Sequence, residues 1–512
     1  MLPASKKVDA VMTLDELIAP LEKQGEVTHR HGDARISIAS LTDDSRQITP
    51  GTLFVAVKGE RVDGHAYVRQ AVEAGAVALI VQDASSVSDH TVPTIGLRDS
   101  RRALGLLAAR LHNDPSAHLR MIGVTGTNGK TTTTYLIKAM LESAKRKVGL
   151  IGTVSYEIGS ERIDASHTTP GAVELQQLLA RMVQAGMDSV AMEVSSHALA
   201  MDRTSGCEYD TAVFTNLTQD HLDYHHTMDE YFQAKARLFT GLTTSGSKSG
   251  PKRAIVNVDD PWARRIKEVC PVAVWTYSIR EPSDIRAYDV RLSVHGTTFR
   301  VVTPSGEGQI DNLLVGEHNI YNVLAAIGVG LNEGLSLDVI REGIRTVRNV
   351  PGRFERVEAG QDFTIVVDYA HTEDALVRLL AAAHALKTGR IITVFGCGGD
   401  RDRGKRPKMG RAATEHSDVV ILTSDNPRTE DPMAILKEVE VGVRDVLKSD
   451  RVRYEMIPDR RAAIKMAIRE AKSGDMVLIA GKGHEDYQII GKQKFPFDDR
   501  EVAREAVGKL TR

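Results

Sequence analysis

The sequence predicts an α/β protein of three domains, built around a central, mostly parallel sheet flanked by helices. Its 512 residues exceed what one hydrophobic core usually organises, so the length favours about three domains. Short apolar runs alternate with helical segments through most of the chain, as in parallel sheets covered on both faces. This alternation begins again after Val350-Pro351-Gly352. We therefore place the domains at residues 1–117, 118–350 and 351–512.

The N-terminal domain is expected to be a smaller α/β unit. The apolar runs Leu53–Val57 and Val77–Val81 predict strands. His65–Ala74 and Arg101–Leu111 are expected to be helices, and Asn113–Ser116 has the composition of a linker.

The central domain is expected to resemble P-loop nucleotide-binding folds in its mostly parallel sheet. Met121–Val124 is an apolar strand that runs into a glycine-rich turn, and a helix begins near Thr131. The further strand candidates are Ser189–Val194, Ala212–Leu217, Ala254–Val258 and Ala273–Tyr277.

The C-terminal domain is expected to be a Rossmann-like, doubly wound unit. Its strand candidates are Phe363–Asp368, Ile391–Phe395, Val419–Thr423 and Met476–Ala480. In such sheets the functional groups lie at the C-terminal ends of the strands.

Composition excludes several classes of protein. Hydrophobic residues make up 42% and charged residues 26% of the chain, as in ordinary globular proteins. The formal charge of −2 gives no field that would attract nucleic acid or an anionic membrane surface. Met1–Leu17 carries charge and lacks the apolar stretch of a signal peptide, so we expect a cytoplasmic protein without membrane insertion. Cys207, Cys270 and Cys397 are far apart in sequence, which favours neither a disulfide framework nor a zinc site.

The segment Gly123–Thr131 has the features of a phosphate-binding loop. Backbone N–H groups of Gly126, Thr127, Asn128 and Gly129 can surround phosphate oxygens at the N-terminus of the following helix. Lys130 can reach the β- and γ-phosphates, and the Thr131 hydroxyl can hold Mg²⁺. Val124 stands where the strict motif has glycine, so a plain glycine-rich turn with a surface lysine is the alternative.

Acidic and histidine side chains follow two of the predicted central strands. Glu193 ends a strand at the edge where the glycine-rich turn lies, a suitable place for a Mg²⁺ carboxylate, although a turn-capping role is the alternative. Five such residues crowd one later loop: Asp220, His221, Asp223, His225 and His226. They could form a transition-metal site, but no thiol is near in sequence and the phosphate loop favours Mg²⁺. Lys235, on the expected helix Asp229–Phe239, is by itself a solvated lysine.

Asp425-Asn-Pro-Arg428 follows a strand of the C-terminal domain. A guanidinium held by a proline-stiffened turn suits the capture of a carboxylate. The alternative for Arg428 is an ordinary surface arginine.

Ordered motifs along the chain make the sequence resemble the Mur ligases, which build the stem peptide of peptidoglycan. They are Asp44–Arg46, Leu53–Ala56, Gly126–Thr132, Met192–His197, Phe214–Thr218, Asp220–His225, Ala234–Lys235, Gly316–Asn319, Pro351–Arg353, Asp368–His371 and Gly481–Glu485. The resemblance implies a ligase that uses ATP and Mg²⁺ to phosphorylate a carboxylate of UDP-N-acetylmuramoyl-L-alanyl-D-glutamate. The acyl phosphate would then be joined to meso-diaminopimelate. The alternatives are a lysine-adding relative, a folylpolyglutamate synthase-like ligase and a non-catalytic nucleotide-binding regulator.

The resemblance also implies roles for particular residues, with a UDP-sugar-binding N-terminal, an ATP-binding central and an acceptor-binding C-terminal domain in a monomeric protein. For catalysis and Mg²⁺ the matching residues are Lys130, Thr131, Glu193, His221 and Lys235, the last carbamylated to N6-carboxylysine. For ATP they are Gly126 to Thr132 with His318, Asn319, Arg353, Asp368 and His371. For the donor they are Ser45, Thr168, Thr169, Ser195, Arg203 and Lys235. For diaminopimelate they are Arg401, Asp425, Asn426, Pro427, Arg428, Gly481 and Glu485. Two residues depart from the family pattern: Met201 replaces a donor-contacting glutamine of some relatives, and Glu373 replaces a proline.

Overall fold

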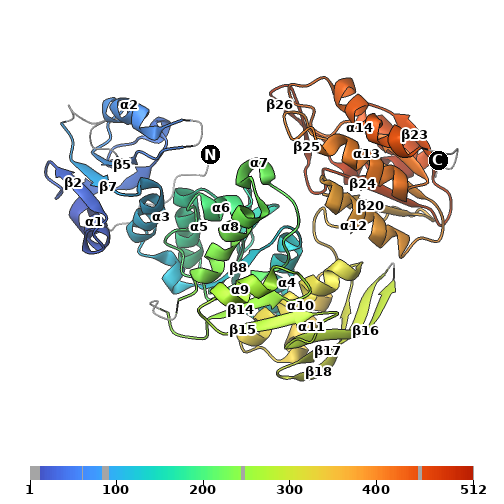
Figure 1. Ribbon diagram of the computed structural model, residues 1–512, viewed down its shortest axis with the longest axis horizontal. Helices are drawn as coiled ribbons and strands as arrows, with labels where there is room; N and C mark the ends of the chain where they lie inside the picture. Colours follow the sequence, from blue (N-terminus) through green and yellow to red (C-terminus); the bar gives the residue numbers. More distant parts are fainter. Residues whose placement is uncertain are drawn as a thin grey trace.

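The computed structural model describes residues 12–59, 62–82, 91–243, 248–293, 295–447 and 452–510. Figure 1 shows three α/β domains that follow one another in chain order, from blue through green and yellow to red. The fold class expected from the sequence is confirmed.

The N-terminal domain contains a five-stranded sheet of order β2-β7-β6-β5-β4. These strands are β2 (Val27–His31), β4 (Ser40–Thr42), β5 (Thr52–Val55), β6 (Ala78–Val81) and β7 (Thr94–Leu97), and only β2 is antiparallel to its neighbour. The short pair β1 (Met12–Thr13) and β3 (Ser37–Ile38) lies beside it. Its α-helices are α1 (Leu14–Lys23), α2 (Val68–Glu73) and α3 (Ser100–Leu111). The predicted strands are confirmed, whereas the predicted helix His65–Ala74 begins as a 3₁₀ turn, Gly64–Tyr67.

The central domain is organised on an eleven-stranded sheet of order β11-β10-β9-β12-β8-β13-β14-β15-β16-β17-β18. From one edge to the other these strands are Glu161–Asp164, Ser155–Ile158, Val148–Ile151, Ser189–Glu193, Arg120–Thr125, Thr211–Phe214, Arg253–Asn257, Val274–Ser278, Ile285–Ser293, Gly296–Thr303 and Gly306–Asn312. The middle, from β9 to β16, is parallel, as the alternating pattern predicts. The antiparallel strands at both edges were not predicted.

Helices cover both faces of this sheet. One face packs against α4 (Lys130–Ser143), α10 (Glu317–Asn332) and α11 (Leu337–Thr346). The other packs against α5 (Ala172–Gln184), α8 (Met228–Thr240) and α9 (Ala263–Val269). The short helices α6 (Ser196–Ala200) and α7 (Leu222–His225) follow β12 and β13. Helix α10 is buried along almost its whole length, which explains why its apolar run is too long for one amphipathic stripe.

The C-terminal domain contains a six-stranded sheet of order β19-β20-β24-β21-β22-β23. These strands are β19 (Glu355–Arg356), β20 (Thr364–Asp368), β21 (Ile391–Phe395), β22 (Val419–Leu422), β23 (Arg453–Met456) and β24 (Met476–Ala480). Helices α12 (Glu373–His384), α13 (Lys405–His416) and α14 (Pro432–Val446) cover one face, and α15 (Arg460–Glu470) and α16 (Asp499–Val507) the other. A separate hairpin, β25 (Tyr487–Ile490) and β26 (Gln493–Pro496), follows β24.

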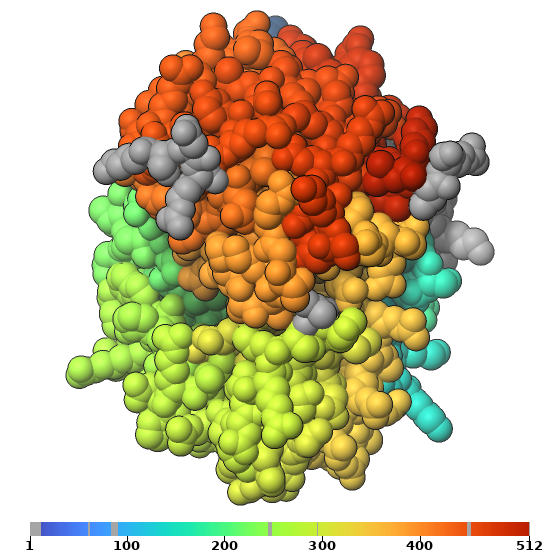
Figure 2. Space-filling view, turned by 90° about the vertical axis from the view of Figure 1, so that its right-hand side faces the viewer, coloured from blue at the N-terminus to red at the C-terminus, as the bar shows by residue number. Residues whose placement is uncertain are grey.

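The C-terminal domain rests against the central one (Figure 2). In the part of the chain that the structure covers, none of the helices has the length and apolar character that crossing a bilayer requires.

Candidate active site

The phosphate loop lies between β8 and α4 and is tied to the segment after β13. The N–H of Thr127 donates to the Asn216 carbonyl at 2.9 Å, and the N–H of Asn128 donates to Asn216 Oδ1 at 3.0 Å. Gly126 has φ +152°, and a Cβ there would lie 1.8 Å from Thr215 Oγ1. Only glycine therefore fits this close approach, and the N–H groups of Thr127 and Asn128, which were expected to face phosphate, are bonded to Asn216 instead.

Two lysines converge on this loop. Lys130 Nζ donates to the carbonyls of Gly126 and Thr127, both at 2.9 Å, and Lys235 Nζ donates to the Gly126 carbonyl at the same distance. Lys235 is 1% exposed, so its interpretation as a solvated lysine is wrong. Burial, with the neighbouring Lys130 charge, holds the pKa of the Lys235 amine well below its ordinary value.

Glu193 lies at the end of β12, beside β8 and the phosphate loop. Its carboxylate is buried and accepts hydrogen bonds from the Thr153 N–H at 2.9 Å and the Thr153 hydroxyl at 3.0 Å. Thr131, in the first turn of α4, is buried next to Lys130. Within the described ranges, no cluster of three or more His, Cys, Asp or Glu side chains has metal-site geometry. Mg²⁺ often needs only one or two protein oxygens plus phosphate and water, so a carboxylate and a hydroxyl fit it.

His221 and His225, which follow β13, pack with His197 of α6 in a cluster of rings. The ring centres of His197 and His221 are 4.7 Å apart, and His225 stacks on Tyr231 at 5.0 Å. His225 Nε2 lies 2.9 Å from the Ser196 hydroxyl. Burial, and then the positive charges of His197, Lys130 and Lys235, lower the pKa of His221. The neutral imidazole therefore adds no positive charge beside the phosphate loop.

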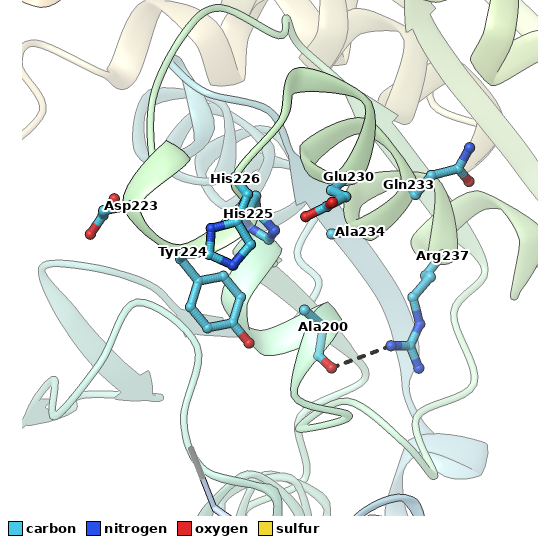
Figure 3. Close-up of a pocket in the computed structure, with 9 residues that line it drawn as sticks. All are labelled: Ala200, Asp223, Tyr224, His225, His226, Glu230, Gln233, Ala234 and Arg237. Carbon is cyan, nitrogen blue, oxygen red and sulfur yellow. Dashed lines mark hydrogen bonds between the residues drawn. The ribbon is translucent and has the colours of Figure 1, made fainter. Parts of the chain in front are cut away.

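A pocket is lined by residues of α8 and of the segments before it (Figure 3). Its walls are Asp223, Tyr224, His225 and His226 with Glu230, Gln233, Ala234 and Arg237 of α8 and Ala200 of α6. Arg237 donates to the Ala200 carbonyl at 3.5 Å across it. The pocket borders α6, the helix that Ser195 caps.

The candidate donor residues of the central domain lie close to Glu193 and are linked by hydrogen bonds. The Thr169 hydroxyl donates to the Glu193 carbonyl at 2.8 Å and accepts from the Ser195 N–H at 3.0 Å. Arg203 donates to the Thr169 carbonyl at 3.3 Å, and Thr168 lies 3.1 Å from Thr153. Arg203 Nη2 also lies 3.2 Å from the sulfur of Met201, the residue that differs from the family pattern, so Met201 contacts a candidate donor residue. Ser45 is separate from this group, on the N-terminal domain, where it donates to Gln70 at 3.3 Å.

Arg353 connects the C-terminal domain to the phosphate loop. Its guanidinium donates to Thr131 Oγ1 at 3.2 Å and lies 4.9 Å from the centre of the Tyr369 ring. Asp368, at the end of β20, accepts from the N–H groups of Phe354 at 2.6 Å and Ala370 at 2.8 Å. These bonds fix the turn that carries Arg353. His371 Nδ1 lies 2.9 Å from the Tyr369 carbonyl, beside the same turn.

His318 and Asn319 begin α10 at the domain junction. Asn319 donates to the Val315 carbonyl at 2.8 Å and accepts from Asn322 at 2.9 Å. Asn322 in turn accepts from the Thr133 hydroxyl of α4 at 3.3 Å, so Asn319 reaches the phosphate loop only indirectly. Burial lowers the pKa of His318 to about 4.

Asp374 is an interdomain contact that the sequence did not reveal. Its carboxylate accepts from Asn128 Nδ2 of the phosphate loop at 3.1 Å and from the Thr218 hydroxyl at 3.3 Å. Arg378 pairs with the same oxygen at 3.0 Å. An acidic residue in the first turn of a helix is ordinarily explained by the helix dipole, so its sequence context gave no signal of this contact.

The candidate acceptor residues form a compact group at the C-terminal ends of β22 and β24. Asn426 Nδ2 donates to Glu485 Oε2 at 2.9 Å, and a Cβ on Gly481 would lie 2.8 Å from Asp425 Oδ2. Arg428, at φ +50°, donates to the Gly399 carbonyl at 2.7 Å.

The hairpin β25–β26 holds the turn that carries Arg428. The Arg428 N–H donates to the Ile489 carbonyl at 3.1 Å, and the Gly491 N–H donates to the Arg428 carbonyl at 2.7 Å. The Pro427 carbonyl accepts from the Glu430 N–H at 3.1 Å. Arg401 is exposed and donates to the Asp400 carbonyl at 3.1 Å, so it stands at the rim of this group.

Tyr369 and Gly352 join the acceptor group to the nucleotide group. The charges of Glu485 and Asp425, as well as that of Arg353, act on the Tyr369 hydroxyl, whose pKa is raised mainly by burial. Gly352 has φ +67°, and a Cβ there would lie 2.2 Å from the His484 backbone nitrogen. The turn before Arg353 therefore packs directly on the acceptor loop.

Three family models match the chain in order: the Mur ligase family catalytic domain at residues 37–112, the Mur ligase middle domain at 124–330, and the Mur ligase glutamate ligase domain at 352–483. A UDP-N-acetylmuramoyl-L-alanyl-D-glutamate–2,6-diaminopimelate ligase of Geobacillus thermodenitrificans is 48% identical over 97% of this chain and 99% of its own. One of the same name from Gloeobacter violaceus is 48% identical over 97% and 98%.

A solved structure of a ligase with that name has a TM-score of 0.70 at 32% identity, covering 98% of this chain and all of its own. Folylpolyglutamate synthase of Mycobacterium tuberculosis shares the fold. Its solved structure has a TM-score of 0.60 at 20% identity and covers 80% of this chain and 95% of its own. The fold and the phosphate-loop site together define an ATP-dependent ligase that joins an acid to an amino acid. The chain belongs to the Mur ligase family.

Proposed function

We propose that the protein joins meso-diaminopimelate to the D-glutamate γ-carboxylate of UDP-N-acetylmuramoyl-L-alanyl-D-glutamate, forming ADP and phosphate. One observation carries the choice of acceptor: Asp425, Asn426, Arg428 and Glu485 form one group, and the loop 481–485 that carries Glu485 packs on Gly352, directly before Arg353. This group offers a guanidinium for a carboxylate and carboxylates for an ammonium, which are the groups of an amino-acid end. The names of the relatives agree with it.

The phosphate loop and the two domains divide the reaction between them. We assign the triphosphate to the phosphate loop and Lys130, with Arg353 reaching the same loop from the C-terminal domain. The donor carboxylate attacks the γ-phosphorus, the bond to the bridging oxygen breaks and ADP leaves. The neutral amine of the acceptor then attacks the acyl carbon, phosphate leaves, and the nitrogen releases one proton as the amide forms. Because an acyl phosphate hydrolyses readily, contact between the two domains protects it from water.

Thr131 and Glu193 are the side chains that would hold Mg²⁺, and the ion would neutralise charge on the phosphates. His221 lies near both lysines, and we assign it to the surroundings of the metal site. We assign His318, Asn319, Asp368 and His371 to the nucleotide side of the junction.

Lys235 is the residue that we propose to be carbamylated. Burial lowers the pKa of the Lys235 amine and so raises its uncharged fraction, and the uncharged amine reacts with CO₂ to give a carbamate and one proton. The carbamate would place an anion beside Gly126 that can serve a metal ion. The resemblance supplies this modification, and the burial of Lys235 supports it.

The N-terminal domain is assigned to the uridine end of the donor through Ser45, and Thr168, Thr169, Ser195 and Arg203 to its phosphate or peptide part. We take the three domains to be residues 1–117, 118–350 and 351–512, as the sequence predicts. We infer a monomeric, cytoplasmic enzyme, since one chain supplies all three binding regions.

The test is ADP formation by the purified chain with Mg²⁺. We expect it only when the donor, ATP and meso-diaminopimelate are present together, with L-lysine unable to replace the acceptor. ADP formation with a folate and glutamate would instead indicate a folylpolyglutamate synthase-like ligase. Nucleotide binding without turnover in any mixture would indicate a regulator.

Arg428→Ala is expected to raise the KM for diaminopimelate about 100-fold and to leave the KM for ATP nearly unchanged, because a charge-assisted bond to a carboxylate is lost. Steady-state ADP formation with each substrate varied in turn measures both constants. Arg411→Ala is the matched control, because Arg411 is an exposed arginine of the same domain that pairs with Asp445. Equal increases in both KM values would contradict the assignment of Arg428 to the acceptor.

A further inference from the structure

Lys482 is a buried lysine in the acceptor group, and it is not among the residues proposed to contact the acceptor. Its side chain is 0% exposed, and its Nζ lies 2.9 Å from Glu485 Oε2 and 3.2 Å from Asn426 Oδ1. It also lies 5.3 Å from the centre of the Tyr487 ring. A fully buried ammonium is costly unless its charge is paired, and here the partner is a proposed acceptor contact.

The contacts of Lys482 fix two acceptor residues at once. Glu485 Oε2 accepts from both Lys482 and Asn426, so this oxygen is already occupied. Asn426 Oδ1 accepts from Lys482 and from the Ile489 N–H at 2.9 Å, which turns its amide nitrogen toward Glu485. The second oxygen of Glu485 is left to face an acceptor. Lys482 thereby sets the orientation of both side chains.

The four charged side chains of the inner group balance one another. Asp425 and Glu485 are the two carboxylates, and Lys482 and Arg428 are the two cations, so the inner group has no net charge. The nearby Arg460 is buried with Asp499 in a pair of its own at 2.7 Å. Arg401 is exposed at the rim of the group. Asp486 and Lys494 are also exposed, near Tyr487, and carry one negative and one positive charge.

A balanced group favours a ligand end that is itself balanced. The far end of diaminopimelate carries one ammonium and one carboxylate, so binding it leaves no uncompensated charge. The far end of lysine brings an ammonium alone, and that of 2-aminopimelate brings a carboxylate alone. Each would leave one partly buried charge without a partner, which costs binding free energy.

We propose that Lys482 is a positioning residue that sets acceptor specificity by orienting Glu485 and Asn426 and by cancelling one of the two carboxylates. The site then takes a far end that is a complete amino acid and rejects an end with a single charge of either sign. This inference rests on the proposed function, and it adds the residue that balances the charge.

The wild-type enzyme gives the first test. We compare kcat/KM for diaminopimelate, lysine and 2-aminopimelate in the ADP-forming assay with saturating donor and ATP. Both single-charge acceptors are expected to be about 100-fold poorer than diaminopimelate or worse. If 2-aminopimelate is used as well as diaminopimelate, the balance of charge does not govern specificity and the inference is overturned. If diaminopimelate itself gives no ADP, the proposed function fails instead.

Lys482→Met gives the second test, because it leaves the group with one excess negative charge. Diaminopimelate is expected to become about 100-fold poorer and 2-aminopimelate poorer still, while lysine is expected to be used better than by the wild type. A merely structural role would weaken all three acceptors by the same factor, and that result would overturn the inference. Lys494→Met is the matched control, since Lys494 lies 3.7 Å from the centre of the same Tyr487 ring on its exposed side. Should Lys482→Met fail to fold, the comparison of the three acceptors with the wild-type enzyme still tests whether the balance of charge governs specificity.

Discussion

Replacing Lys235 with methionine is expected to lower kcat about 100- to 1000-fold while leaving the protein folded. The loss follows because the proposed carbamate, and with it one anion beside the phosphate loop, can no longer form. Methionine has a similar length and no charge to bury, so it fits the site against Tyr231. Steady-state ADP formation and thermal unfolding of the same preparations measure the two effects.

The pH dependence of stability adds a second readout in CO₂-free buffer. The pKa of Lys235 is lower in the folded than in the unfolded state, so the unfolded state binds the proton more readily. The wild type therefore loses stability from this amine as the pH falls below the ordinary lysine pKa of 10.5, and the methionine variant does not. Lys267→Met, on the exposed face of α9, is the control. If Lys235→Met keeps full activity, Lys235 has no role in catalysis.

Gly352→Ala is expected to lower kcat at least about 100-fold and also to lower the thermal unfolding temperature. At φ +67° an alanine is strained, and its Cβ would meet the His484 backbone nitrogen at 2.2 Å and the Gly483 Cα at 2.8 Å. Backbone atoms on both sides must then separate. Because Arg353 follows directly, it would be displaced from Thr131 Oγ1, and acceptor and nucleotide residues would lose their alignment.

Gly360→Ala separates the two causes. Gly360 has φ +90° but no atom within 4 Å of a built Cβ, so alanine there meets the backbone strain without the collision. We expect Gly360→Ala to cost about 1 kcal/mol in unfolding free energy and to keep its activity. If both glycine variants retain activity, the packing of the two turns does not align the site.

Strand positions were predictable because buried parallel strands are short, continuous apolar runs between turn residues. Met476–Ala480 and Ile391–Phe395 coincide with β24 and β21, and the helix after the phosphate loop begins at Lys130. The edge strands β16 to β18 escaped prediction. Their exposed positions alternate with buried ones, which dilutes the apolar signal.

The contacts that define the site were less predictable, because they join residues distant in sequence. Lys235 has the sequence context of a surface lysine, and only the packing of α8 on β8 buries it against Gly126. Asp374 and Lys482 similarly acquire partners from other segments, Asn128 and Asn426. Side-chain direction at two facing sheet edges decides such contacts, and periodicity in the sequence does not encode it.

Arg353 lies 4.9 Å from the centre of the Tyr369 ring, and Gly352, just before it, packs on the loop that carries Glu485. A bisubstrate inhibitor with a triphosphate mimic at one end and a diaminopimelate end at the other would need only a short linker around that ring. Once one end is bound, the other is held at high effective concentration, so the affinity of the joined compound should far exceed that of either half.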